Sequence, residues 1–164
     1  MGTIQATTTY KGTTTSTMNN PREITARYDD PLNAIWLHTA ELCGLEVVRS
    51  DTVFASFDGV RTLLICTEEH FDPDDCLAQM IFHELCHALV MGVSGSHQRD
   101  WGLNNVDDRD AVFEHACHRL QATLSDRYGL RDVLAPTTEH RAYYDQLPAD
   151  PLAPGKDPAV ELAT

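Results

Sequence analysis

Two histidines and a glutamate near the middle of the chain have the types and spacing of a metal-dependent hydrolytic site. They belong to the motif His83-Glu84-Leu85-Cys86-His87. On a helix, His83 and His87 lie one turn apart on the same face, where two imidazoles can bind one zinc ion. Glu84 lies about 100° around that helix, where its carboxylate can take a proton from a metal-bound water. The motif therefore predicts hydrolysis of an amide or peptide bond by a metal-activated water, with Glu84 as general base.

The sequence around this motif predicts a buried helix. Cys76 to Met91 contains no Pro or Gly, and its uncharged positions are Cys, Leu, Ala, Gln, Met, Ile, Phe and Val. A helix that is apolar all round is typical of a protein core. Two histidines and a glutamate are costly inside such a helix unless a partner satisfies them, and a metal ion is such a partner. A core helix with accidental polar residues is the alternative interpretation.

The motif, preceded by Met80-Ile81-Phe82, resembles the active-site helix of the zincin metallopeptidases. The layout of roughly residues 30–127 is similar to that of small gluzincins such as the ImmA/IrrE family. The resemblance implies zinc bound by two histidines and a glutamate on a later helix, and peptide-bond hydrolysis. It also implies an edge strand beside the motif helix that holds extended peptides, and Arg61 to Thr67 is the candidate. The metzincin pattern does not fit, because Val90 and Val93 follow the motif instead of its glycine and histidine.

The candidates for the third metal ligand are His97, Asp110, Glu114, His115 and His118. Helical angles measured from the expected core face of the later helix place Asp110 and Glu114 at its edge, one turn apart. The same angles place His115 in solvent. The resemblance favours Glu114, which follows His87 by 27 residues. Asp110 is then either an acceptor that orients a ligand histidine or a first-turn acid that stabilises the helix dipole.

His97 is the alternative third ligand. His97-x-x-x-Trp101 is similar in part to the third-ligand segment of SprT-like zincins. The loop of Gly, Val and Ser before it does not favour a helix at that point. No residue is marked by the sequence as a stabiliser of a negatively charged oxygen. The downstream candidates are expected to be ordinary core or surface aromatics: Tyr128, His140, Tyr143 and Tyr144.

The remaining segments predict one α+β domain, with a small sheet, the buried motif helix and a second long helix packed on it. Asp30-Pro31 is expected to begin the first helix and Gly44 to end it. Asp72-Pro73 is expected to begin the motif helix, and Asp107 or Asp108 the second long one. Further expected elements are strands over Leu45–Arg49, Thr52–Phe57 and Arg61–Thr67, a hairpin turn at Asp58-Gly59, apolar positions Phe113, Ala116, Cys117, Leu120 and Leu124 on the second long helix, and a short helix over Glu139–Gln146.

Composition divides the chain into three parts. Residues 1–20 are a Thr-rich lead that we expect to be disordered, residues 21–147 are the zincin-like domain, and residues 148–164 are a Pro-rich tail that we expect to be loose. The acidic connection Glu68 to Asp75 is expected to stabilise the helix that follows it. A second, acid-rich metal site there is the alternative.

Charge and cysteine content limit the possible partners and compartment. A net charge of −13 argues against nucleic acid and against an anionic membrane surface. The sequence has no run of 18 apolar residues, so no membrane-spanning helix is expected. Five cysteines without a CxxC pair indicate buried free thiols in a reducing cytoplasm.

Together these features predict a cytoplasmic, zinc-dependent metallopeptidase with a peptide or protein substrate, no nucleic acid and no membrane. Zinc is expected on His83, His87 and Glu114, with Glu84 as general base. The alternative is a non-catalytic zincin-fold module that binds a protein or regulates one. A purely structural zinc site is disfavoured, because Cys86 points about 60° away from His83 on the side opposite His87.

Overall fold

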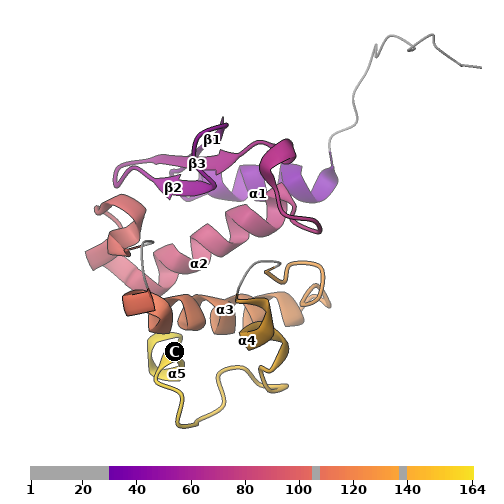
Figure 1. Ribbon diagram of the computed structural model, residues 1–164, viewed down its shortest axis with the longest axis vertical. Helices are drawn as coiled ribbons and strands as arrows, with labels where there is room; N and C mark the ends of the chain where they lie inside the picture. The colour runs from indigo at the N-terminus through magenta and orange to yellow at the C-terminus, as the bar shows by residue number, and fades with distance from the viewer. Residues whose placement is uncertain (1–29, 105–107, 137–139) are drawn as a thin grey trace, which may run out of the picture.

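The computed structural model describes residues 30–104, 108–136 and 140–164. Figure 1 shows the chain as stacked layers: the sheet and α1 lie on one side, α2 runs through the middle, and α3 with α4 and α5 lies on the other side. Five α-helices and one three-stranded sheet among these residues confirm the predicted α+β class. The predicted lead over residues 1–20 lies outside the described residues.

The first helix begins and ends where the sequence predicts. α1 spans Pro31–Leu42, and the carboxylate of its N-cap Asp30 accepts a 2.8 Å hydrogen bond from the N–H of Leu32. Gly44 follows the helix with φ +83°, a left-handed conformation that glycine adopts without a steric cost. The N–H of Leu45 then donates to the carbonyl of Ala40 and closes the helix end.

The sheet contains β1 (Glu46–Ser50), β2 (Ala55–Phe57) and β3 (Thr62–Cys66), in the order β1-β3-β2. β2 and β3 form the predicted antiparallel hairpin, and β1 runs parallel to β3. The turn is held by Asp58, whose Oδ1 accepts hydrogen bonds from the backbone N–H groups of residues 60, 61 and 62.

The prediction that Arg61 to Thr67 is an edge strand is wrong. This segment contains β3, which pairs with β1 on one side and with β2 on the other. Both rows of its backbone hydrogen-bonding groups face neighbouring strands, so it has no edge to offer a peptide. The edge strands are β1 and β2. The sequence did not indicate this order, because strand order is set by packing over the whole domain and not by local sequence.

The motif helix α2 spans Leu77–Gly95, and its N-cap is Cys76 rather than Asp72. The segment before it forms a separate turn, in which Asp74 has φ +78° and the N–H of Asp75 bonds the carbonyl of Asp72. The first turn of α2 is satisfied from another helix instead, because the N–H of Ala78 donates to Asn33 of α1 at 2.9 Å.

α2 lies in the core, as the sequence predicts. Ile81 packs with Leu63 and Ile65 of β3, while Phe82 stacks on Trp36 of α1 with ring centroids 4.5 Å apart. By length and composition alone α2 could cross a membrane, but more than half of that apolar window is buried inside the protein. The helix is interrupted at Gly92, where φ is +58°, so the predicted loop begins as a kink inside the helix.

The second long helix, α3, spans Ala111–Asp126 after the short 3-10 turn Asp108–Asp110. Its N-cap is Asp110; Asp107 lies outside the described residues. Its buried surface is wider than the predicted apolar face, because α2 covers one side and α4 and α5 cover the other. The buried side chains of α3 therefore include polar ones, notably His118, Arg119 and Gln121.

The prediction of a loose tail over residues 148–164 is wrong. After α4 (Arg141–Asp145), the tail ends in α5 (Ala159–Leu162), where Ala159 and Ala163 pack on Ala116 of α3. Arg119, which is 7% exposed, donates to the carbonyl of Pro151 and to Asp157 at 2.8 Å. A buried guanidinium must be paired, and the tail supplies its partners. The short helix expected before the tail is confirmed in its described part.

The five cysteines are free thiols, as predicted, but they are not all buried. Cys66, Cys86 and Cys117 are buried, whereas Cys43 is exposed beyond the end of α1.

Candidate metal centre

Side chains from α2 and α3 meet where the two helices pack together. The Nε2 atoms of His83 and His87 lie 2.9 Å apart, 3.5 and 3.4 Å from the two carboxylate oxygens of Glu114. In tetrahedral coordination with bonds of about 2.0–2.1 Å, donor atoms are separated by about 3.3 Å. The three side chains thus already have nearly the spacing that one zinc-sized ion requires, and they form a group that could hold a metal ion.

The far side of each histidine ring is held by α3. Nδ1 of His83 lies 3.1 Å from Oε1 of Gln121, and Nδ1 of His87 lies 3.0 Å from Sγ of Cys117. When Nδ1–H donates to these groups, the Nε2 lone pair of each ring is directed at the centre. Glu114, Cys117 and Gln121 follow one another at helical spacing, so one face of α3 provides a potential metal ligand and the contacts to both rings.

Burial and charge set the protonation of the group. Burial lowers the pKa of His83, but the hydrogen bond and charge of Glu114 outweigh it and raise this pKa to about 9. Burial and the neighbouring His83 lower the pKa of His87. Burial raises the pKa of Glu114, while both histidines lower it well below its usual range. The raised pKa of His83 and the lowered pKa of Glu114 mean that a cation which binds to this group competes with a proton on His83.

Glu84 is buried beside this group and is held by a tryptophan. Its Oε2 accepts a 2.9 Å hydrogen bond from Nε1 of Trp101, which stacks on Phe57 of β2 with centroids 3.8 Å apart. The backbone of Trp101 and of Asp100 is left-handed, with φ +58° and +49°. Asp100 Oδ1 accepts from the hydroxyl of Ser56 and the N–H of Phe57, at 2.7 and 3.0 Å. The sheet therefore fixes the loop, and the loop fixes the Glu84 carboxylate.

Two other predicted residues lie away from the group. Asp110 Oδ2 accepts a 2.8 Å hydrogen bond from the backbone N–H of Asn104, so it fastens the start of α3. The ring nitrogens that it was expected to orient face Gln121 and Cys117 instead. His97 is exposed in the turn after α2 and belongs to neither donor group among the described residues.

The other histidines of α3 are more buried than the sequence suggests. His115 is half-buried and stacks on Tyr143 at 3.7 Å, so the prediction that it points into solvent is wrong. His118 is 1% exposed and stacks on His83 at 4.9 Å. Burial and the nearby His83 keep the pKa of His118 well below its ordinary value. Glu114, His118 and His140 form a second group of potential metal ligands.

Three contacts of the candidate site are not among those that the sequence predicts: those of Cys117, Gln121 and Trp101. The spacing of Glu114, Cys117 and Gln121 on one helical face was an available signal, but Cys117 was assigned to the apolar core face. No sequence signal marks Trp101, because its contact with Glu84 depends on a left-handed backbone that tryptophan rarely adopts.

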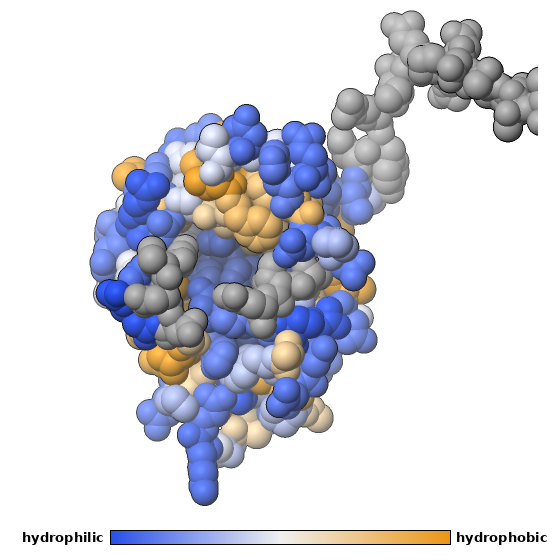
Figure 2. Space-filling view, in the orientation of Figure 1, coloured by the Kyte–Doolittle hydropathy of each residue, from blue (hydrophilic) through white to orange (hydrophobic). Residues whose placement is uncertain are grey.

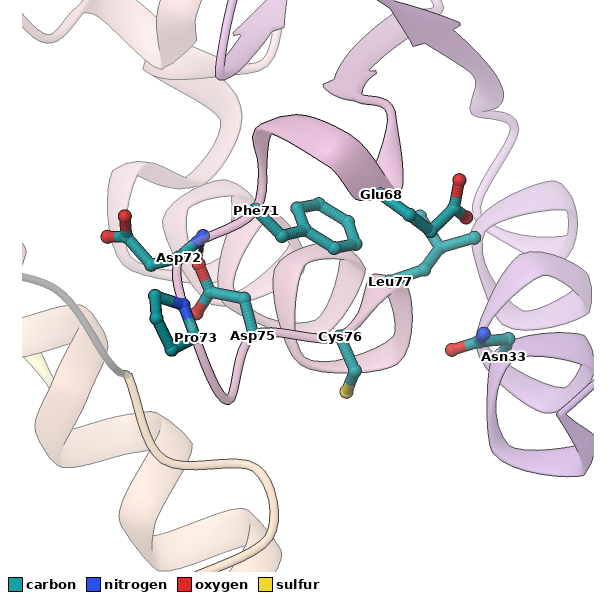
Figure 3. A pocket seen from close by; sticks show the side chains of 8 residues that line it. All are labelled: Asn33, Glu68, Phe71, Asp72, Pro73, Asp75, Cys76 and Leu77. Atoms are coloured by element: carbon teal, nitrogen blue, oxygen red, sulfur yellow. Dashed lines mark hydrogen bonds between the residues drawn. The ribbon is translucent and has the colours of Figure 1, made fainter. Parts of the chain in front are cut away.

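The acidic connection before α2 lines a separate pocket of about 420 Å³, drawn in Figure 3. The pocket lies between the start of α2 and Asn33 of α1. Asp75 accepts a hydrogen bond from the backbone N–H of Asp72. Among the described residues this stretch provides no group of metal donors, so the alternative of a metal site there has no support from the structure.

The candidate metal centre is partly exposed to solvent. The side chains of His83 and Glu114 are 16% and 20% exposed, whereas that of His87 is 6% exposed. Figure 2 shows a hollow with a largely hydrophilic surface on this face, over the region where α2 and α3 lie side by side in Figure 1.

Comparison with protein-family models, with curated proteins and with solved structures finds no match.

Proposed function

We propose that this protein is a zinc-dependent metallopeptidase. His83, His87 and Glu114 would bind the zinc ion, and Glu84 would act as general base. The observation that supports this proposal best is the close approach of the donor atoms next to a buried carboxylate. The two Nε2 atoms are 2.9 Å apart, and each lies 3.4 or 3.5 Å from one of the two Glu114 oxygens. Three protein ligands leave the fourth position of a tetrahedral ion open, as in catalytic rather than structural zinc sites.

Each side chain of the centre has a role in this mechanism. When bound, zinc supplies a water of lowered pKa and polarises the substrate carbonyl. The Glu84 carboxylate takes the proton of the attacking water and later returns it to the leaving amine. Trp101 holds that carboxylate in place, while Gln121 and Cys117 keep the two imidazoles aimed at the metal. The low exposure of the centre reduces competition from bulk water.

The proposed substrate is a peptide or a protein, and the hydrophilic hollow in Figure 2 is the proposed entry to the centre. A net charge of −13 supports the expectation that nucleic acid and anionic membranes are not partners. The five free thiols support a location in the cytoplasm.

The decisive experiment compares Glu84→Gln with the unmutated chain in zinc content and in cleavage of a mixed peptide library. Glu84→Gln keeps the indole hydrogen bond and removes the base, so we expect full zinc content and a loss of rate of about 10²- to 10⁴-fold. Glu161→Gln, at an exposed position on α5, is the matched control. Equal cleavage by Glu84→Gln would contradict the mechanism, and a folded chain that binds no supplied zinc would refute the proposal. Stoichiometric zinc without any cleavage would favour the non-catalytic binding module.

A further inference from the structure

His118 is a buried polar side chain whose hydrogen-bonding capacity is unused. It is 1% exposed, and neither ring nitrogen has a hydrogen-bond partner within the part of the chain that the structure describes. A neutral imidazole carries one donor and one acceptor, and burying both without a partner is costly. Such a group calls for a ligand that the described part of the chain does not supply.

The surroundings of His118 indicate what that ligand is. One donor atom each from Glu114, His118 and His140 lie within 4.8 Å of one another. The rings of His118 and His140 have centroids 5.2 Å apart, and the His118 ring also stacks on that of His83. Two imidazoles and a carboxylate are a donor set that suits divalent transition metals.

We propose that Glu114, His118 and His140 bind a second divalent cation beside the first, so that the centre is dinuclear. This inference rests on the proposed zinc site, because Glu114 serves both ions. Both of its oxygens lie near histidines of the first site, Oε1 near His87 and Oε2 near His83, and one of them also lies within 4.8 Å of a ring nitrogen of His118 and of His140. An ionised carboxylate has about four lone-pair sites and can therefore bridge two ions, which in known two-metal sites lie about 3.5–4 Å apart.

The second site gives a use to residues that the mononuclear mechanism leaves idle. It accounts for the burial of His118 without a hydrogen-bond partner among the described residues, and for a position of His140 next to an acid that two other histidines already contact. In a two-metal centre the second ion adds positive charge where negative charge develops on the substrate oxygen. The second cation would thus stabilise the negatively charged oxygen, a role that the sequence does not assign to any side chain.

The test is the metal stoichiometry of the full chain. Metal-stripped protein is titrated with Zn²⁺ by calorimetry, and bound zinc is measured by mass spectrometry after desalting. We expect two zinc ions per chain for the unmutated protein, one for His118→Asn and one for His140→Asn. His97→Asn, which removes an exposed histidine, is the control and should keep two. If His118→Asn does not fold, His140→Asn, at a half-buried position, decides the question.

The outcomes separate this inference from the function proposed above. One zinc ion per chain that is lost in His87→Ala and retained in His118→Asn and His140→Asn overturns the second site and leaves the first intact. No zinc in the unmutated chain overturns both. Two zinc ions, with Glu114→Ala losing both and His118→Asn losing one, support the dinuclear centre.

Discussion

The indole N–H of Trp101 donates a 2.9 Å hydrogen bond to the carboxylate of Glu84. The same indole stacks on Phe57, and the N–H of Phe57 is bound by Asp100, the residue before Trp101. A strand edge, a strained loop and the motif helix are thereby connected through three neighbouring contacts. The direction of the proposed general base thus depends on the sheet as well as on its own helix.

Trp101→Phe tests this connection. The phenyl ring keeps the stack on Phe57 but cannot donate to Glu84, so we expect the carboxylate to turn away from its productive position. One hydrogen bond worth about 1.5 kcal/mol corresponds to roughly a tenfold loss of kcat. The measurement is peptide cleavage with zinc content determined on the same samples. Loss of zinc, or an unchanged kcat, would show that Trp101 does not position Glu84.

Glu114→Gln tests the third ligand. The amide has no charge and binds zinc weakly, so we expect zinc affinity to fall by at least about a hundredfold, measured by competition with a chelator. Asp110→Asn is the matched control at the start of the same helix, where the side chain accepts a hydrogen bond from the N–H of Asn104. If Glu114→Gln keeps its affinity while His97→Asn loses it, Glu114 is not the ligand.

Cys117→Ala tests the support of His87. Without Sγ, the Nδ1 of His87 loses its 3.0 Å contact and the ring is less well oriented, so zinc affinity should fall by about 10- to 100-fold. Cys86→Ala is the control, because Cys86 is equally buried in the same apolar cluster. It should lower the free energy of unfolding without changing zinc affinity. Equal effects of the two variants on affinity would assign Cys117 to packing alone.

Asp157→Asn tests the anchoring of the tail and its pH dependence. Burial raises the pKa of Asp157, but hydrogen bonds from Arg119, the N–H of Ala159 and Tyr143 lower it overall. A lowered pKa stabilises the folded state above the ordinary value of 3.8, and this contribution is lost as the pH falls below it. Urea unfolding at pH 7 should show a loss of about 2 kcal/mol for the variant. At pH 3 the difference in free energy of unfolding between the variant and the unmutated chain should be smaller. An equal difference at both pH values would show that ionisation of Asp157 does not stabilise the fold.

Local signals in the sequence were sufficient for several elements. Asp30-Pro31 and Gly44 bound α1, Asp58-Gly59 forms the hairpin turn, and the apolar stretch around the motif forms the buried helix, because each depends on residues a few positions apart. The start of α2 was missed, since its N-cap is a cysteine and Asn33, far away in sequence, satisfies its first turn.

Features that depend on distant partners could not be read from the sequence. One such feature is the central position of β3 in the sheet. Another is the packing of the tail, which depends on the hydrogen bond between Arg119 and Asp157, 38 residues apart. Within the site, the motif indicated His83 and His87, the helical angles left Asp110 and Glu114 open, and the resemblance to small gluzincins favoured Glu114. The structure brings His83, His87 and Glu114 together. The roles of Trp101 and His118 required the packed structure, because their contacts cross between elements.

The contact between α2 and α3 combines the apolar cluster around Cys86 and Cys117 with a group of ionisable side chains. Near the candidate centre, the strength of the contact between the two helices depends on whether a proton or a cation neutralises the charge among His83, His87 and Glu114. A bound cation would then cross-link α2, on the side of the sheet, to α3, on the side of the tail. When a chelator removes the cation, amide deuterium uptake should increase first in α3, while α2 retains the protection that its apolar contacts with β3 provide.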